Sequence, residues 1–73
     1  MRDLILEALR KHAEGQIEKH KANVEVLLTH PTGVADHPDH LATIGKELDE
    51  MEKYDSQLEL IDKYFTPKDP FKK

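Results

Sequence analysis

The fold is decided by the stretch Thr29-His30-Pro31-Thr32-Gly33-Val34-Ala35-Asp36-His37-Pro38, which separates two helix-patterned segments of similar length. Pro31 disfavours helical backbone at His30, so a helix arriving from the N-terminal side ends just before it. Gly33 allows the backbone conformations that a turn requires. Asp36 is suited to cap a second helix, with Pro38 in its first turn. Two long helices joined by so short a connection must fold back on each other.

The segment before this stretch predicts a helix from about residue 2 to residue 28. Its inward stripe recurs at steps of three or four residues, which is the spacing of one helix face. The stripe consists of Leu6, Leu9, Ala13, Ile17, His20, Val24 and Leu27. Two residues depart from a regular amphipathic helix. Gly15 lies mid-helix, which costs ~1 kcal/mol relative to Ala, and His20 occupies a place where an aliphatic side chain is expected.

The segment after the stretch predicts a second helix from about residue 38 to residue 65, with a loop over 29–37. Its stripe repeats close to every 3.5 residues, as in a left-handed helix pair. The stripe consists of Leu41, Ile44, Leu48, Met51, Tyr54 or Asp55, Leu58, Ile61 and Phe65. Pro67 disfavours helix at Thr66, so the helix ends near residue 65. We expect residues 66–73 to form a mobile C-terminal tail.

The predicted fold is therefore all-α: one antiparallel two-helix hairpin over residues 1–65. Folding at the loop places residue i of the first helix opposite roughly residue 69 − i of the second. Gly15 then faces Tyr54 and leaves room for its ring. His20 comes within reach of Asp49 or Glu52 across the hairpin, or of Asp55 in a second copy.

Several apolar residues lie partly outside this seam and need cover. A chain of 73 residues without Cys seldom stabilises a core by itself. We therefore expect hairpins to self-associate into a four-helix bundle or a larger helical oligomer. The residues expected at the oligomer interface are Ile5, Val26, Leu28, Leu60 and Tyr64.

The loop region concentrates possible metal ligands. His37 and His40 are three residues apart, so in a first helical turn they share a face and could hold zinc or nickel. His30, Asp36 and Asp39 lie nearby in the sequence. In the alternative interpretation, the aspartates favour the helix N-terminus and the histidines are exposed loop residues.

The middle of the first helix is locally basic. Arg10, His12, Lys19 and His20 are candidate ligands for a phosphate group or a small nucleotide. In the alternative, these cations belong to a solvated face and pair with Glu7, Glu14 and Glu18. His20 is then a hydrogen-bonded seam residue that fixes the register of the two helices.

Composition narrows the function classes. Charged residues make up 36% of the chain, and 11 Lys+Arg against 15 Asp+Glu give a net charge of −4. This acidic balance argues against nucleic acid or an anionic membrane as partner, and no apolar run approaches the ~18 residues that span a bilayer. The chain has no Gly-rich phosphate loop, Cys nucleophile or plausible Ser-His-Asp set. We expect a cytoplasmic protein that is not an enzyme and has no cofactor.

A resemblance is carried by three runs: Gly15–Val26 (GQIEKHKANVEV), Pro31–Asp39 (PTGVADHPD) and Glu59–Phe65 (ELIDKYF). On these runs the chain resembles short proteins of tailed phages that infect marine cyanobacteria, with a likeness that extends over residues 1–65. The resemblance implies a phage-encoded protein that acts in an infected bacterial cell, or else a virion component. That group has no established activity, so no functional residue is carried over.

These observations predict a small helical interaction protein that binds a host or virion protein. The alternative is an oligomeric ligand-binding protein that sequesters an anionic metabolite, a nucleotide or a metal ion. Its site would lie at a subunit seam or in the His-rich loop.

Overall fold

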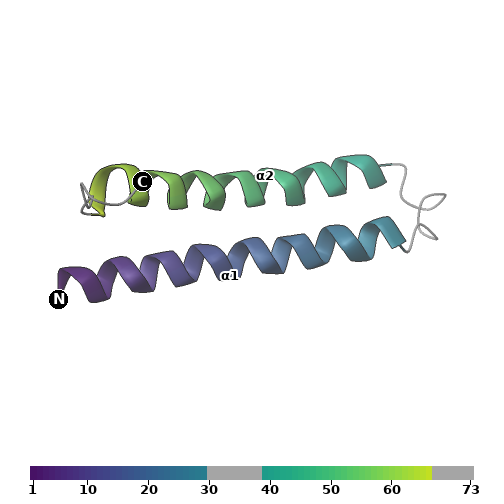
Figure 1. Ribbon diagram of the computed structural model, residues 1–73. Helices are drawn as coiled ribbons and strands as arrows, with labels where there is room; N and C mark the ends of the chain where they lie inside the picture. Colours follow the sequence, from purple (N-terminus) through teal and green to yellow (C-terminus); the bar gives the residue numbers. More distant parts are fainter. Residues whose placement is uncertain (30–38, 67–73) are drawn as a thin grey trace.

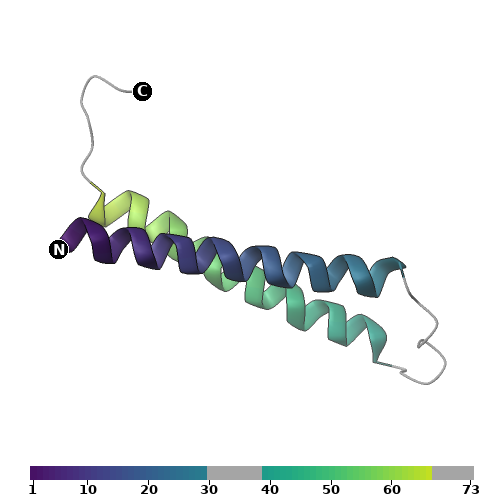
Figure 2. The same ribbon diagram turned by 90° about the horizontal axis from the view of Figure 1, so that it is seen from below.

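The computed structural model describes residues 1–29 and 39–66, and all of its regular structure there is helical. Helix α1 spans Arg2–Thr29, and helix α2 spans His40–Leu60. A π-helical segment, η2, continues α2 over Ile61–Phe65. The two long helices lie side by side and antiparallel, with the start of α1 close to η2 (Figure 1, and turned by 90° in Figure 2). The predicted helical hairpin is confirmed.

Two residue series with a seven-residue period face each other across the seam. On α1 the series is Leu6, Ala13, His20 and Leu27, and on α2 it is His40, Glu47, Tyr54 and Ile61. His20 bonds Glu47, and the carbonyl of Leu27 bonds His40, so residue i faces residue 67 − i. This register is two residues away from the predicted one. A second series beside the first contains Ile17 and Val24 of α1 and Ile44, Met51 and Leu58 of α2.

The prediction placed four apolar residues in the seam that the structure leaves half or more exposed: Leu9, Leu41, Leu48 and Phe65. Half-buried polar residues take the neighbouring positions, namely Arg10 on α1 and His40 and Glu47 on α2. The phase of α2 follows from Tyr54 and Ile61, which lie seven residues apart. Counting back by sevens from Tyr54 gives Glu47 and His40, one residue before each of the expected leucines.

The start of α2 is tied to the end of α1. The helix begins at His40, two residues later than predicted, and the backbone N–H of Thr43 donates to the carbonyl of Asp39 (2.9 Å). His40 Nε2 lies 3.0 Å from the carbonyl oxygen of Leu27. A carbonyl only accepts, so the imidazole donates and satisfies a carbonyl in the last turn of α1, where the helix itself lacks donors. The predicted cap Asp36, like Pro38, lies outside the described residues.

The other end of the hairpin is held by two arginines of α1. Arg2 donates to the carbonyl oxygen of Phe65 (2.7 Å), and Arg10 donates to both Asp62 and the hydroxyl of Thr66. Thr66 Oγ1 in turn donates to the carbonyl of Ile61, five residues back (3.1 Å). Thr66 has extended backbone, as expected before a proline. The helical segment ends at Phe65, where the sequence analysis expected the second helix to end.

The hairpin encloses very little core. Among the described residues, only Ala13 (0% exposed) and Ile61 (9%) are buried apolar residues. The interpretation of Gly15 as space for the Tyr54 ring was wrong, because a Cβ added at Gly15 meets no atom within 4 Å. Over residues 1–29 and 39–66, neither helix has an apolar stretch long enough to cross a membrane.

Candidate functional site

A polar cluster lies in the middle of the seam. Glu47 Oε1 lies 2.6 Å from His20 Nδ1 and 2.9 Å from the side-chain nitrogen of Asn23. The two main side chains are well covered, with 12% of His20 and 22% of Glu47 exposed. An ionised carboxylate only accepts, so Nδ1 carries the proton in this contact. The cluster therefore pins α1 and α2 at one register, since a slipped pairing leaves a partly buried carboxylate unsatisfied.

The hydrogen bonds lower the pKa of the Glu47 carboxyl. The bond from His20 has the largest effect and the bond from Asn23 the next, while partial burial acts in the opposite direction. The charge of Lys19 lowers the pKa slightly further. Glu47 is thus held in its ionised form, which suits a structural acceptor better than a general acid.

Tyr54 fills the seam beside this cluster. Its ring stacks on His20, with ring centres 6.5 Å apart and planes at 13°, and meets His12 edge to face at 5.7 Å. The ammonium of Lys53 lies 4.8 Å from the ring centre. Tyr54 therefore lies beside both histidines in the seam.

The sequence analysis missed Glu47 as the partner of His20. It expected Asp49 or Glu52, and that expectation is wrong, because the real register is two residues away from the predicted one. Glu47 lies seven residues before Tyr54, in the same series as Ile61. This spacing would have identified Glu47 if polar residues had also been considered for the seam. The contact between Arg10 and Asp62 was also missed, because only the apolar stripes were considered for contacts across the hairpin.

The four candidate anion ligands do not converge. Arg10 is engaged by Asp62 and Thr66 at one end of the hairpin. His20 bonds Glu47 about 15 Å further along α1, at 1.5 Å of rise per residue. Only His12 and His20 meet, on the ring of Tyr54, and Lys19 is exposed beside them.

Of the two candidate metal ligands, His37 lies outside the described residues. His40 is half-buried and uses Nε2 to cap α1. In the part of the chain that the structure describes, no three His, Cys, Asp or Glu side chains cluster closely enough to hold a metal ion.

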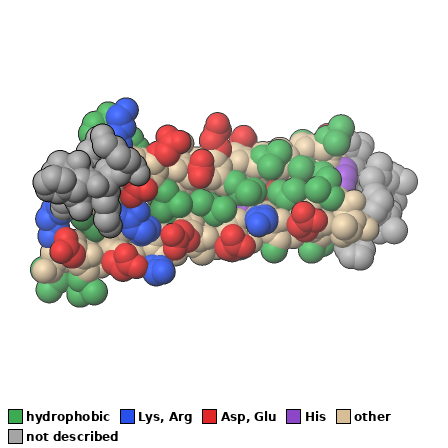
Figure 3. All heavy atoms as spheres, in the orientation of Figure 1, with side chains coloured by type: hydrophobic (Ala, Val, Ile, Leu, Met, Phe, Trp, Pro, Cys, Tyr) green, Lys and Arg blue, Asp and Glu red, His purple; other side chains and the backbone are tan. Residues whose placement is uncertain are grey.

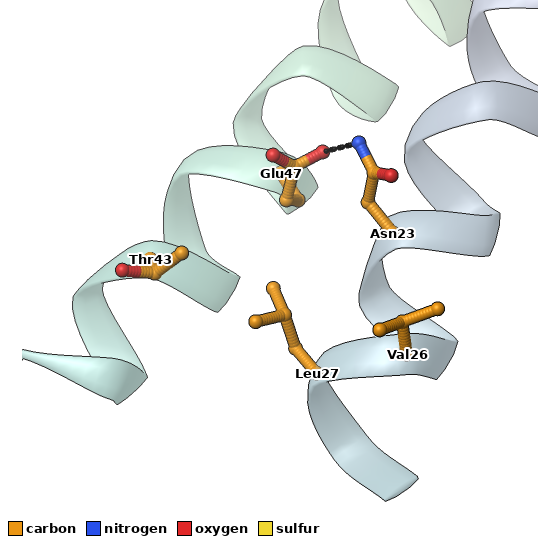
Figure 4. A pocket seen from close by; sticks show the side chains of 5 residues that line it. All are labelled: Asn23, Val26, Leu27, Thr43 and Glu47. Carbon is orange, nitrogen blue, oxygen red and sulfur yellow. Dashed lines mark hydrogen bonds between the residues drawn. The ribbon is translucent and has the colours of Figure 1, made fainter. Parts of the chain in front are cut away.

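The first side of the seam, which we call the amide side, carries mostly uncharged side chains. It contains two shallow grooves. One, of about 290 Å³, is lined by Asn23, Val26, Leu27, Thr43 and Glu47 (Figure 4, where Leu27 reaches between the helices). The other, of about 330 Å³, is lined by Leu9, Gln57, Leu60 and Ile61.

All five residues expected at an oligomer interface are at least half exposed. Val26 and Leu60 line the grooves of the amide side. Ile5 lies one turn before Leu9, and Tyr64 lies four residues after Leu60, so both border the same side. Leu28 follows the seam residue Leu27 by one position and turns to the opposite side.

That opposite side, which we call the acidic side, has a different character. Its groove, of about 270 Å³, is lined by the apolar side chains of Ile17 and Met51 and by the carboxylates of Glu52 and Asp55. Figure 3 shows hydrophobic side chains running between the two helices, with Asp and Glu side chains along both borders and some Lys or Arg side chains among them on the α1 border.

Comparison of the chain with family models, curated proteins and solved structures finds no significant match.

Proposed function

We propose that the protein is a non-enzymatic helical interaction protein. In this proposal hairpins pair into a four-helix bundle, and the bundle binds a host or virion protein in the cytoplasm of an infected bacterial cell. The phage setting rests on the resemblance described above. The binding role rests on the distribution of apolar surface.

One observation carries the proposal: the hairpin leaves most of its large apolar side chains uncovered. Eleven of them are at least half exposed in the described residues, while only Ala13 and Ile61 are buried. Single exposed leucines are ordinary on soluble proteins, but contiguous apolar patches mark interaction surfaces. An amphipathic hairpin with so small a core gains most by burying these side chains against another molecule.

The amide side is the better surface for a second copy. The carboxylates there have partners: Glu47 is bonded to His20 and Asn23, and Glu50 is paired with Lys53 at 3.0 Å. Pairing by a two-fold axis brings the same surface of both copies together. A surface with few charges can do this without like-charge repulsion. The amide side also holds Leu9, Val26 and Leu60 in its two grooves.

Sedimentation equilibrium at micromolar concentration tests the assembly. We expect the wild type to sediment as a dimer or larger. Leu60→Lys places a charge in the amide side and should shift the protein towards monomer. Leu41→Lys is the matched control, because Leu41 is 82% exposed and lies outside the amide-side grooves. A stably folded wild-type monomer would refute the bundle, and equal effects of both variants would refute this choice of interface.

Differential scanning fluorimetry separates this function from ligand sequestration. With zinc, nickel and a panel of nucleotides, an interaction protein keeps its melting temperature. A sequestering protein shifts upward by several degrees at ligand concentrations well above Kd. A reproducible shift with any of these ligands would favour the alternative.

A further inference from the structure

The groove of the acidic side combines an apolar floor with a charged rim. Ile17 and Met51 form the floor, and Glu52 and Asp55 stand at its α2 border. On α1, Glu14 lies one turn before Ile17 and Lys21 lies one turn after it, with Glu18 further out on the same helix. Apolar surface extends from the groove towards the loop end, because Leu48 lies one turn before Met51 and Leu41 two turns before that. Both leucines are at least half exposed.

The carboxylates on this side are largely unneutralised. Within residues 1–29 and 39–66, Glu18, Glu52 and Asp55 form no ion pair within 4.0 Å. Lys11 lies 3.8 Å from Glu7 and 3.9 Å from Glu14, so one ammonium is shared between two carboxylates. The rim therefore carries more carboxylates than cations: Glu52 and Asp55 stand on the α2 border, and Glu14 and Glu18 stand with Lys21 on the α1 border.

This charge pattern disfavours a second copy as the occupant. Pairing two acidic sides would bring the rim carboxylates of one hairpin against those of the other, and like-charge contact disfavours such an interface. A partner that fits must offer an apolar stripe bordered by Lys or Arg. From Leu41 to Met51 the strip is about 15 Å long, at 1.5 Å per residue, which matches about three turns of a helix.

We propose that the acidic side docks a basic amphipathic helix of another protein. The apolar stripe of that helix packs on Ile17, Leu48 and Met51, and its flanking cations meet Glu52 and Asp55 on the α2 border. This is binding of a helix in a groove, with charge selecting the partner and its orientation. The inference rests on the proposed function and names the chemistry of its partner.

The test uses three synthetic 18-residue peptides and isothermal titration calorimetry with the full chain. The first peptide has a leucine stripe flanked by Lys and Arg. The second keeps the stripe and replaces every cation with Glu. The third keeps the cations and replaces every leucine with Ser. We expect only the first peptide to bind, with an affinity that falls as salt is added.

Two double variants locate the site. Glu52→Gln with Asp55→Asn neutralises the rim and should weaken binding about tenfold, as expected for two lost charge contacts. Asp39→Asn with Asp49→Asn changes the net charge equally at exposed positions that line none of the grooves, and should leave binding unchanged. Circular dichroism of both variants verifies that each remains helical.

Several results would overturn the proposal. They are no binding of the basic amphipathic peptide, equal binding of the acidic or the serine peptide, and equal weakening by the two double variants. The sedimentation experiment on Leu60→Lys tests self-association, whereas the peptide titrations test the groove of the acidic side. The groove proposal can therefore fail while the proposed interaction function is retained.

Discussion

Replacing Gly15 by alanine offers a test in which two explanations predict changes in Tm of opposite sign. The residue is exposed on the outer face of α1, and a Cβ built there meets nothing within 4 Å. Gly15→Ala should therefore add helix propensity without a clash, which stabilises a helix by about 1 kcal/mol. For a domain of this size, such a change raises Tm by roughly 4–8 °C. If Gly15 instead makes room for the Tyr54 ring, the same variant lowers Tm.

Ala22 supplies the matched control. It lies seven residues after Gly15, at the equivalent outer position, and is also exposed. Ala22→Gly should destabilise by about the same 1 kcal/mol, and the double variant should unfold close to the wild type. The two sites share no contact, so their effects should add.

Thermal and urea unfolding followed by circular dichroism measure these effects. All variants are compared at one protein concentration, because self-association makes Tm depend on concentration. A lower Tm for Gly15→Ala would refute the open environment at Gly15, and with it the packing of this face of α1. Gly45→Ala provides a second test of the same reasoning, since a Cβ there also meets nothing within 4 Å.

The remaining predictions concern the seam. His20→Leu should lower the urea midpoint because it removes the main hydrogen bond to Glu47. The double variant His20→Leu with Glu47→Leu should recover or exceed the wild-type midpoint, because no partly buried carboxylate is then left without a partner. A His20→Leu variant more stable than the wild type would refute this. The pKa of Glu47 is lowered from its ordinary 4.5, so its contribution to stability is present above that pH and is lost as pH falls through the lowered folded-state pKa. Urea midpoints between neutral pH and about pH 3 should therefore fall less steeply in Glu47→Gln, and unchanged steepness would contradict the assignment. Ile61→Ala should lower the free energy of unfolding by about 2 kcal/mol, at the low end for a buried isoleucine because the site borders an open groove. Leu41→Ala should leave it nearly unchanged. If thermal melts show equal losses of stability, Leu41 is covered in solution.

The sequence predicted the hairpin because helix boundaries depend on local chemistry. Pro67 and the breaker-rich stretch between the helices act on their immediate neighbours, and the helix ends fell within two residues of expectation. The seam was harder to predict, because its phase depends on how two helices fit together. Hydrophobicity alone selected Leu41 and Leu48, whereas the structure turns His40 and Glu47 inward. These polar residues can lie inside because His20 and the carbonyl of Leu27 satisfy them, and such pairings are not visible in either helix alone.

The arginine contacts at the open end of the hairpin determine how it responds to force. The start of α1 and Thr66 lie at the same end of the hairpin, so tension between them pulls the helices apart one layer at a time. Arg2 and Arg10 bear the load first, and the layer of His20 and Glu47 bears it only after the outer half has opened. If the two helices were instead pulled in opposite directions along their axes, all the contacts between them would have to break at the same time. If these two ends were attached to larger bodies, we would expect the hairpin to open at low force from the arginine end and to close again from the contact between His40 and Leu27.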